Sequence, residues 1–263
     1  TWRGGLGAGR AFGNAAEMRA GFVLEDGSTR LRNSEEDGPV TDFQTRQYFL
    51  RYQLDGLNDV AFPRSGTGML FEWRRYEERT FDYASADTLE ADWRQVQSWG
   101  RNRLALWFSA GTTWDDQYLE ERNQFRLGGF LNLSGLPRDT LRGPNFGIAR
   151  AIYFRQVGRG GEGMFDMPMY LGMSLEAGNV WGSRSDVDFP SLRTDASLFV
   201  GLDSLLGPVY LSFGYDSGGN GAPRCTLQLG AARDDLGPLE SGDDLLASAG
   251  LTRETSQFFS DDY

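Results

Sequence analysis

The segment Met169-Tyr170-Leu171-Gly172-Met173-Ser174-Leu175-Glu176-Ala177-Gly178 alternates between two kinds of side chain. Its odd positions are Met, Leu, Met, Leu and Ala, and its even positions are Tyr, Gly, Ser, Glu and Gly. Successive side chains of a β-strand point to opposite faces of a sheet. The segment therefore predicts a strand with one apolar face and one face that is polar or small.

The same alternation recurs along most of the chain, in the ranges 47–54, 104–109, 196–203 and 209–216. Clusters such as Glu25-Asp26-Gly27-Ser28 separate the runs and are typical of turns. We predict about twelve strands, each near the ~9–11 residues that a tilted strand needs to cross a bilayer. They begin near Trp2, Glu17, Gln44, Gly68, Asp87, Arg103, Gln124, Phe146, Met169, Asp195, Pro208 and Arg224. Helical periodicity is nearly absent before residue 234, so we predict an all-β chain.

The composition of the 263 residues excludes several classes of chemistry. The 26 basic residues are all Arg, and with 37 acidic residues they give a net charge of −11. Without His there is no Ser–His–Asp triad and no His-ligated zinc site. The acidic balance argues against nucleic acid as a partner. The single cysteine, Cys225, excludes an internal disulfide framework.

Two all-β architectures compete. In a soluble β-sandwich the apolar faces pack together, whereas in a membrane barrel they meet lipid and the polar faces line a lumen. The polar faces here mix Gly and aromatic residues with charges, while a water-facing sandwich surface prefers Thr, Lys and Ser. The charged residues assigned to the polar faces are Arg51, Glu72, Arg74, Arg126, Arg155, Glu176 and Asp203. We favour a transmembrane antiparallel up-and-down β-barrel and keep a soluble β-sandwich binding module as the alternative.

Three segments carry a resemblance to a known family. The range 125–136 resembles the segment that leads into the large inward-folded loop of BamA-like outer-membrane barrels, the bacterial surface antigen family. The range 170–181 resembles the strand motif of that superfamily, an acidic residue followed by Gly, here Glu176 and Gly178. The range 205–215 resembles its turn and penultimate strand. The resemblance covers residues 100–230 well and residues 1–99 by strand pattern only.

Within the superfamily, the chain is most similar to the barrel of patatin-like phospholipase outer-membrane proteins. The motifs of that likeness are Leu133-Ser134-Gly135, Leu141-Arg142-Gly143 and Tyr153-Phe154-Arg155. The resemblance implies that a loop from Leu133 to Pro144 folds inward and fills or gates the lumen. It also implies a pairing between a loop Arg and the acidic residue of the strand motif. Ser134 occupies the Arg position by spacing, so that Arg142 is a candidate substitute partner of Glu176; a solvated loop charge is the alternative.

The chain departs from the family in two ways. The family barrel has sixteen strands, so that either four N-terminal strands lie outside this chain or a smaller barrel closes by itself. We assign residues 1–230 to the barrel, as the C-terminal part of a longer one. In the family, the last strand normally ends the protein with an aromatic residue, whereas this chain continues from Ala231 to Tyr263. Residues 231–263 hold eight acidic residues and two Arg, and we expect an acidic, partly disordered tail.

Patatin-type lipolysis needs a Gly-x-Ser-x-Gly segment, and the chain has none. We therefore expect no catalysis, no cofactor and no metal site. The predicted function is to anchor or translocate a passenger domain or protein in the bacterial outer membrane, with lipid as a partner and a homo-oligomer as an option. The alternative is the barrel portion of a phospholipase whose hydrolase domain lies outside this chain.

Overall fold

The computed structural model describes residues 2–33, 36–59, 61–79, 83–114, 124–158, 167–204, 207–218 and 224–229. Most of them lie in strands, and the one helical element among them is the 3-10 turn η3 (Arg184–Asp186). The strands are β1 (Trp2–Phe12), β2 (Ala16–Asn33), β3 (Glu36–Asp55), β4 (Gly66–Arg79), β5 (Tyr83–Trp99), β6 (Asn102–Trp114), β7 (Phe125–Leu127), β8 (Leu141–Gly143), β9 (Asn145–Gln156), β10 (Met169–Trp181), β11 (Arg193–Ser204), β12 (Gly207–Asp216) and β13 (Arg224–Leu229). Within the described ranges, no helix is long and apolar enough to cross a membrane.

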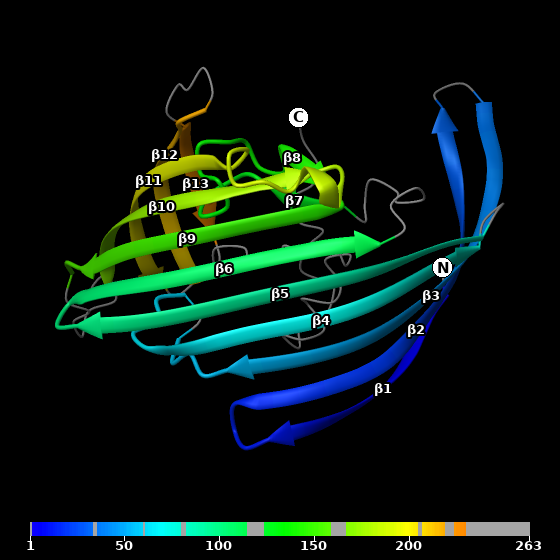
Figure 1. Cartoon of the computed structure of the whole chain (residues 1–263), viewed down its shortest axis with the longest axis horizontal. Helices are drawn as coiled ribbons and strands as arrows, with labels where there is room; N and C mark the ends of the chain where they lie inside the picture. The colour runs from blue at the N-terminus through cyan, green and yellow to red at the C-terminus, as the bar shows by residue number, and fades with distance from the viewer. Residues whose placement is uncertain are drawn as a thin grey trace.

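Eleven of these strands form one antiparallel sheet in the order β1-β2-β3-β4-β5-β6-β9-β10-β11-β12-β13. Apart from the β7–β8 hairpin, each strand pairs with the next one along the chain, which is the up-and-down order. The sheet curves around an interior (Figure 1). Among the described residues, β1 pairs only with β2 and β13 only with β12, so the wall is open between these two strands.

Eleven of the twelve predicted strands lie in this sheet. The exception begins near Gln124 and is wrong as a wall strand, because β7 has three residues and pairs only with β8 in a small hairpin between β6 and β9. The predicted start of β3 at Gln44 was eight residues late. The reason is that β2 and β3, with 18 and 20 residues, extend past the length that a bilayer requires (Figure 1).

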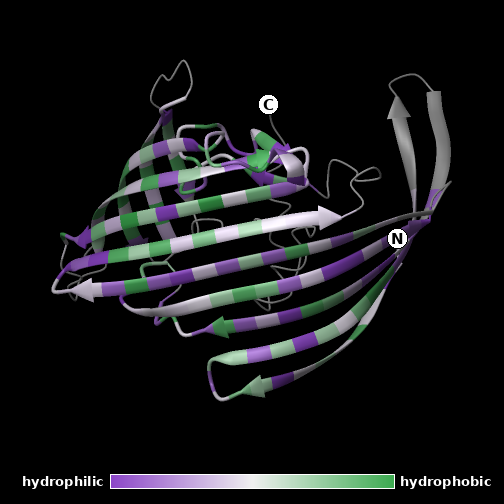
Figure 2. Cartoon of the chain, in the orientation of Figure 1, coloured by the Kyte–Doolittle hydropathy of each residue, from purple (hydrophilic) through white to green (hydrophobic). Residues whose placement is uncertain are grey.

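The two faces of the sheet follow the alternation of the sequence, which is visible as banding along the strands in Figure 2. The apolar face of β10 points outward and is exposed at Leu171, Met173 and Leu175. The opposite face of the same strand buries Ser174 and Glu176. The outward apolar set continues around the wall with Met18, Phe22, Met69, Phe71, Phe108, Leu198, Leu211, Phe213 and Leu227. A soluble sandwich would bury these side chains between two sheets, so the single sheet with its apolar face outward contradicts that alternative.

The barrel has two ends, which we name by their connections. The loop end carries residues 124–144 between β6 and β9, and the turn end carries residues 56–65 between β3 and β4. The tail predicted at 231–263 lies outside the described residues, as do Leu205 and Leu206 of the predicted turn motif.

Candidate functional site

The loop between β6 and β9 folds into a compact unit inside the curved wall at the loop end (Figure 1). The β7–β8 hairpin forms its base, and backbone hydrogen bonds such as Gly128 N to Asn132 O (2.7 Å) and Leu136 N to Leu133 O (3.0 Å) close its turns. Leu131 and Leu133 adopt left-handed backbone angles, with φ of 57° and 69°. Such angles cost about 1–3 kcal/mol at a residue other than glycine. Both leucines are almost fully buried, so their packing offsets this strain.

Glu176 holds the tip of this loop against the wall. Its Oε2 atom accepts hydrogen bonds from the backbone N–H groups of Leu133 (2.6 Å) and Ser134 (2.8 Å). Its Oε1 atom accepts from the hydroxyls of Ser134 and Ser174, each at 2.6 Å. Ser134 Oγ in turn accepts from the backbone N–H of Leu131 at 2.9 Å. The carboxylate is 2% exposed, and these four donors replace the water that it loses on burial.

The rest of the tip lies directly on the backbone of the adjacent strands. The backbone N–H of Gly135 donates to Asp195 Oδ2 of β11 at 2.6 Å. A Cβ atom at Gly135 would overlap the backbone of Tyr215 and Asp216 in β12, and one at Gly214 would overlap the carbonyl of Ser134. The contact thus requires glycine on both sides.

Arg150 of β9 is a site residue that the sequence did not reveal. It is 3% exposed and lies directly across from Glu176 in the β9–β10 register. Its Nη2 atom donates to Asn132 Oδ1 in the loop (3.2 Å), and its Nη1 atom donates to Ser109 Oγ of β6 (3.4 Å). Its guanidinium also lies 5.7 Å from the ring centroid of Trp107. The signal that could have found it is the parity of Arg150 with the buried even positions of β9.

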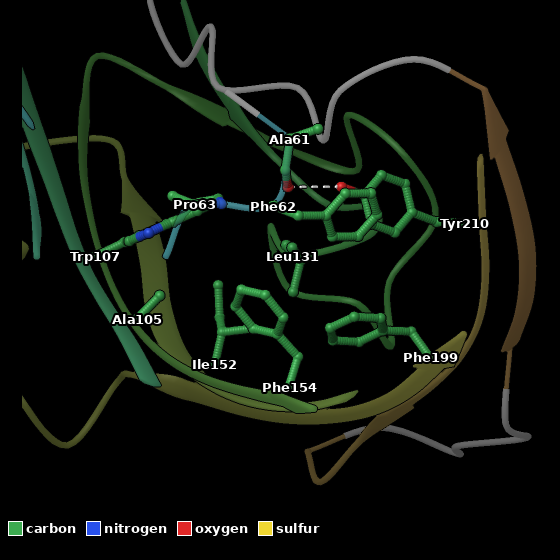
Figure 3. A pocket seen from close by; sticks show the side chains of 10 residues that line it. All are labelled: Ala61, Phe62, Pro63, Ala105, Trp107, Leu131, Ile152, Phe154, Phe199 and Tyr210. Atoms are coloured by element: carbon green, nitrogen blue, oxygen red, sulfur yellow. Dashed lines mark hydrogen bonds between the residues drawn. The ribbon is translucent and has the colours of Figure 1, made fainter. Parts of the chain in front are cut away.

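An apolar cluster fills the lumen beneath the loop (Figure 3). Phe130 and Leu131 reach it from the loop, and Phe62 reaches it from the β3–β4 turn at the opposite end. The wall contributes Val96, Ala105, Ile152, Phe154, Tyr170, Phe199 and Tyr210. The ring of Phe62 stacks on that of Tyr170 with centroids 4.1 Å apart. The lumen beside β6 and β9–β12 is therefore packed with side chains from both ends.

Two hydrogen bonds attach the β3–β4 turn to this side of the wall. The hydroxyl of Tyr210 donates to Ala61 O at 3.0 Å, as the dashed line in Figure 3 marks. Arg103 Nη1 donates to Phe62 O at 2.6 Å, and the Arg103 guanidinium lies over the rings of Phe154 and Tyr170. The turn is thus fixed inside the lumen rather than left at its rim.

The inner face of β3–β5 carries ion pairs outside this apolar cluster. Glu72 accepts from Arg51 Nε at 2.5 Å and also from Arg74. Asp92 accepts from Arg94 Nε at 2.8 Å. A further bond joins Ser109 Oγ to Asp92 at 2.5 Å. The inward assignment of Arg51, Glu72 and Arg74 agrees with these contacts.

Three other residues that the sequence analysis singled out are Arg142, Gly143 and Gly178, and they do not share one environment. Arg142 is exposed, and its Nε atom donates to Asp139 O of the loop at 3.2 Å, so the suggested pairing with Glu176 is wrong. The physical reason is that Ser134, in the position that the resemblance gives to the loop Arg, already bonds to Glu176 together with two backbone N–H groups. Gly143 and Gly178 are buried at close contacts: a Cβ atom at Gly143 would lie 2.8 Å from Val180 Cγ1, and one at Gly178 would lie 2.7 Å from Gly147 O.

Of the remaining lumen candidates, Arg155 is misplaced. In β9 the buried side chains are at even positions, and Arg155 is exposed on the outward parity near the turn end. Arg126 lies in β7 of the loop and not in the wall. Asp203 has the inward parity of β11 and lies close to the end of that strand.

Comparison with known proteins gives a match to the fold of solved structures and no match at the level of sequence. No protein-family model matches the chain, and no curated protein sequence matches it. A solved structure that is similar is the crystal structure of BamA from Haemophilus ducreyi lacking POTRA domains 1–3, with a TM-score of 0.58 over 85% of this chain. The chain has the fold of a BamA-like β-barrel. The sequences are 12% identical, and this chain spans about half (52%) of the length of that BamA chain.

Proposed function

We propose that this chain is the membrane-embedded part of a bacterial outer-membrane protein and that it anchors a passenger domain or protein. The outward apolar face supports the membrane location, because a contiguous exposed apolar face of this extent is unfavourable in water. The observation that carries the anchoring role is the loop tip bound to Glu176 above a packed apolar cluster. Side chains from both ends fill this part of the lumen, which favours a plugged barrel over an open pore.

Membrane insertion is tested with the protein expressed in a Gram-negative host. We expect the chain in the outer-membrane fraction, and we expect a shift in gel mobility between unheated and boiled samples in detergent. A chain found as a monomer in the aqueous fraction, with no heat-dependent shift, would contradict the membrane location.

Translocation is the second candidate role. The observation that favours it is the charged inner face of β3–β5, where Arg51 pairs with Glu72 and Arg94 pairs with Asp92 outside the apolar cluster. Such a face suits a hydrated path along the lumen. Single-channel recording in a planar bilayer separates the roles: the anchor predicts a closed state at rest, and the conduit predicts steady conductance.

We further propose that the chain belongs to the patatin-like phospholipase subgroup of the superfamily, on the basis of the Leu133-Ser134-Gly135 loop motif. In this proposal the described residues have no catalytic role, since Ser134 is enclosed by the loop and Glu176 accepts four hydrogen bonds. Any lipolysis would reside in a hydrolase domain encoded upstream. Reading the coding frame upstream of Thr1 tests this, because a Gly-x-Ser-x-Gly segment there would support the phospholipase proposal and a different domain would refute it.

We also propose a homo-oligomer as an option, which the mass of the detergent-extracted protein tests.

A further inference from the structure

The connection between β10 and β11 folds back over the outer face of the wall at the loop end. Trp181 Nε1 donates to Ser191 Oγ at 2.8 Å, and Asn179 Nδ2 donates to Ser191 O at 2.8 Å. The ring of Trp181 lies on the outer face of β9, where a Cβ atom at Gly147 would be 3.6 Å from it. Residues 182–192 are therefore attached to the outside of the barrel and not to its mouth.

Beside this connection the outer wall is hollowed into an apolar groove of about 590 Å³. Its floor is made of small residues in register across β5, β6 and β9, namely Ala91, Ala110 and Gly147, and of Ala149 and Ala177 in the next row. The aromatic side chains of Phe71, Trp93 and Phe108 line the groove from β4–β6, and Val187, Phe189 and Leu192 line it from the connection. The volume lies within the ~300–1,000 Å³ typical of small-molecule sites.

The position of the groove indicates what covers it. The groove is continuous with the outward apolar face, and polar contacts begin beyond it toward the loop end, where Thr112 Oγ1 donates to Asn145 Oδ1 at 2.7 Å. The connection is polar as far as residue 186, and of its apolar side chains Val187 and Phe189 are 50% and 88% exposed. An aromatic side chain held open in this way at the edge of an apolar groove is stabilised when hydrocarbon covers it.

We propose that this groove binds one acyl chain of a bilayer lipid, at the level where the apolar outer face ends. The inference rests on the proposed membrane location and adds a defined lipid site to it. The small residues of the floor admit the chain, and the rings of Trp93 and Phe108, 5.5 Å apart, border it on one side. Val187 and Phe189 line it on the side of the connection. Farther along the wall, on β10–β12, the outward side chains of Leu171, Leu198 and Leu211 are large.

The test uses the full chain reconstituted in vesicles of phosphatidylethanolamine and phosphatidylglycerol that contain a phospholipid with a photoactivatable diazirine in its acyl chain. After irradiation, mass spectrometry of peptides locates the cross-links. The variant Ala149→Trp fills the groove. The matched control Ala151→Trp adds the same ring two residues away on the same outward face of β9, outside the groove.

For the wild type we expect cross-links concentrated on the peptide that contains Val187 and Phe189, at least five-fold above other outward segments. Ala149→Trp should reduce that labelling about five-fold or more, and Ala151→Trp should leave it within two-fold. Even labelling of all outward segments, or equal loss in both variants, would overturn the site while leaving the membrane location in place. Labelling absent from every outward segment would instead overturn the proposed function. Cross-linking of the groove to a second protein chain with exclusion of lipid would assign it to a protein neighbour and refute the proposal.

Discussion

Replacing Glu176 with glutamine should weaken the attachment of the loop to the wall with almost no change in side-chain volume. The carboxylate accepts two backbone N–H groups and two serine hydroxyls. A glutamine carbonyl can keep the two backbone bonds, and its amide can donate to the hydroxyls, so all four bonds become neutral. Hydrogen bonds to a charged group contribute ~1.5–3 kcal/mol and neutral ones ~0.5–1.5 kcal/mol. The lower cost of burying a neutral group offsets part of the difference, and we expect a net weakening of about 2 kcal/mol.

Hydrogen–deuterium exchange measures this weakening directly. The amides of Leu133 and Ser134 exchange only when the loop opens, so about 2 kcal/mol corresponds to roughly 30-fold faster exchange in Glu176→Gln. Glu72→Gln is the matched control, because Glu72 is also a buried lumen carboxylate but bonds to Arg51 and Arg74 and not to the loop. The reasoning is falsified if the two amides exchange at the wild-type rate in Glu176→Gln, or if Glu72→Gln accelerates them equally.

Three further outcomes are expected. Gly135→Ala should displace the loop tip, because the added Cβ atom would overlap the β12 backbone. It should raise the amide exchange rates of residues 131–136 at least as much as Glu176→Gln does. Exchange at the wild-type rate would show that the tip does not rest on β12. Leu211→Arg should lower the stability of the inserted protein by ~2–4 kcal/mol in a lipid refolding titration if Leu211 lies at mid-bilayer. The control Gln53→Arg changes an exposed residue on the inward side of β3 and should alter the stability by well under ~1 kcal/mol. Equal losses in both variants would refute the assignment of the two faces. Phe62→Ala should cost ~3–5 kcal/mol in the same titration and increase channel opening in planar bilayers, and an unchanged closed state would show that the apolar cluster is not the barrier.

The alternation of the sequence predicted the faces of β10, β11 and β12 correctly. On these strands the outward side chains include Leu171, Leu198 and Leu211. The inward ones are small or polar, apart from the three aromatic residues of the apolar cluster, Tyr170, Phe199 and Tyr210. Here one face is continuously aliphatic or aromatic and the other is mostly small or polar, so the alternation indicates which face points out. The registers that pair these strands follow from the same pattern.

The prediction failed on β9, where Arg155 was assigned to the lumen. The inward residues of β9 include Phe146, Ile148 and Ile152, because they pack on the loop and the apolar cluster rather than on water. Both faces of this strand are therefore apolar, and hydrophobicity does not distinguish them. The side chains that fill the barrel come from distant parts of the chain, so the pattern of a single strand does not predict them.

The contact between Ser134 and Glu176 could be predicted only in part. The resemblance placed Ser134 in the position of the partner residue, but it did not reveal how a serine could replace an arginine. Two backbone N–H groups complete the contact, and they point at the carboxylate because Leu131 and Leu133 adopt positive φ angles. Leucine is rare in that conformation, and nothing in the local sequence indicates it.

The bonds from Tyr210 and Arg103 to the carbonyls of Ala61 and Phe62 join parts of the chain up to 149 residues apart. They form a tie across the hollow of the sheet, between its N-terminal strands and its C-terminal strands. A curved sheet that is stabilised only by hydrogen bonds between neighbouring strands can flatten by small rotations at every strand pair. When hydrogen bonds also cross the interior, they have to break before the sheet can flatten. Mechanical load applied to the early hairpins is therefore transmitted to β6 and β12 through the interior, and the cross-section of the barrel resists distortion even where its wall is open.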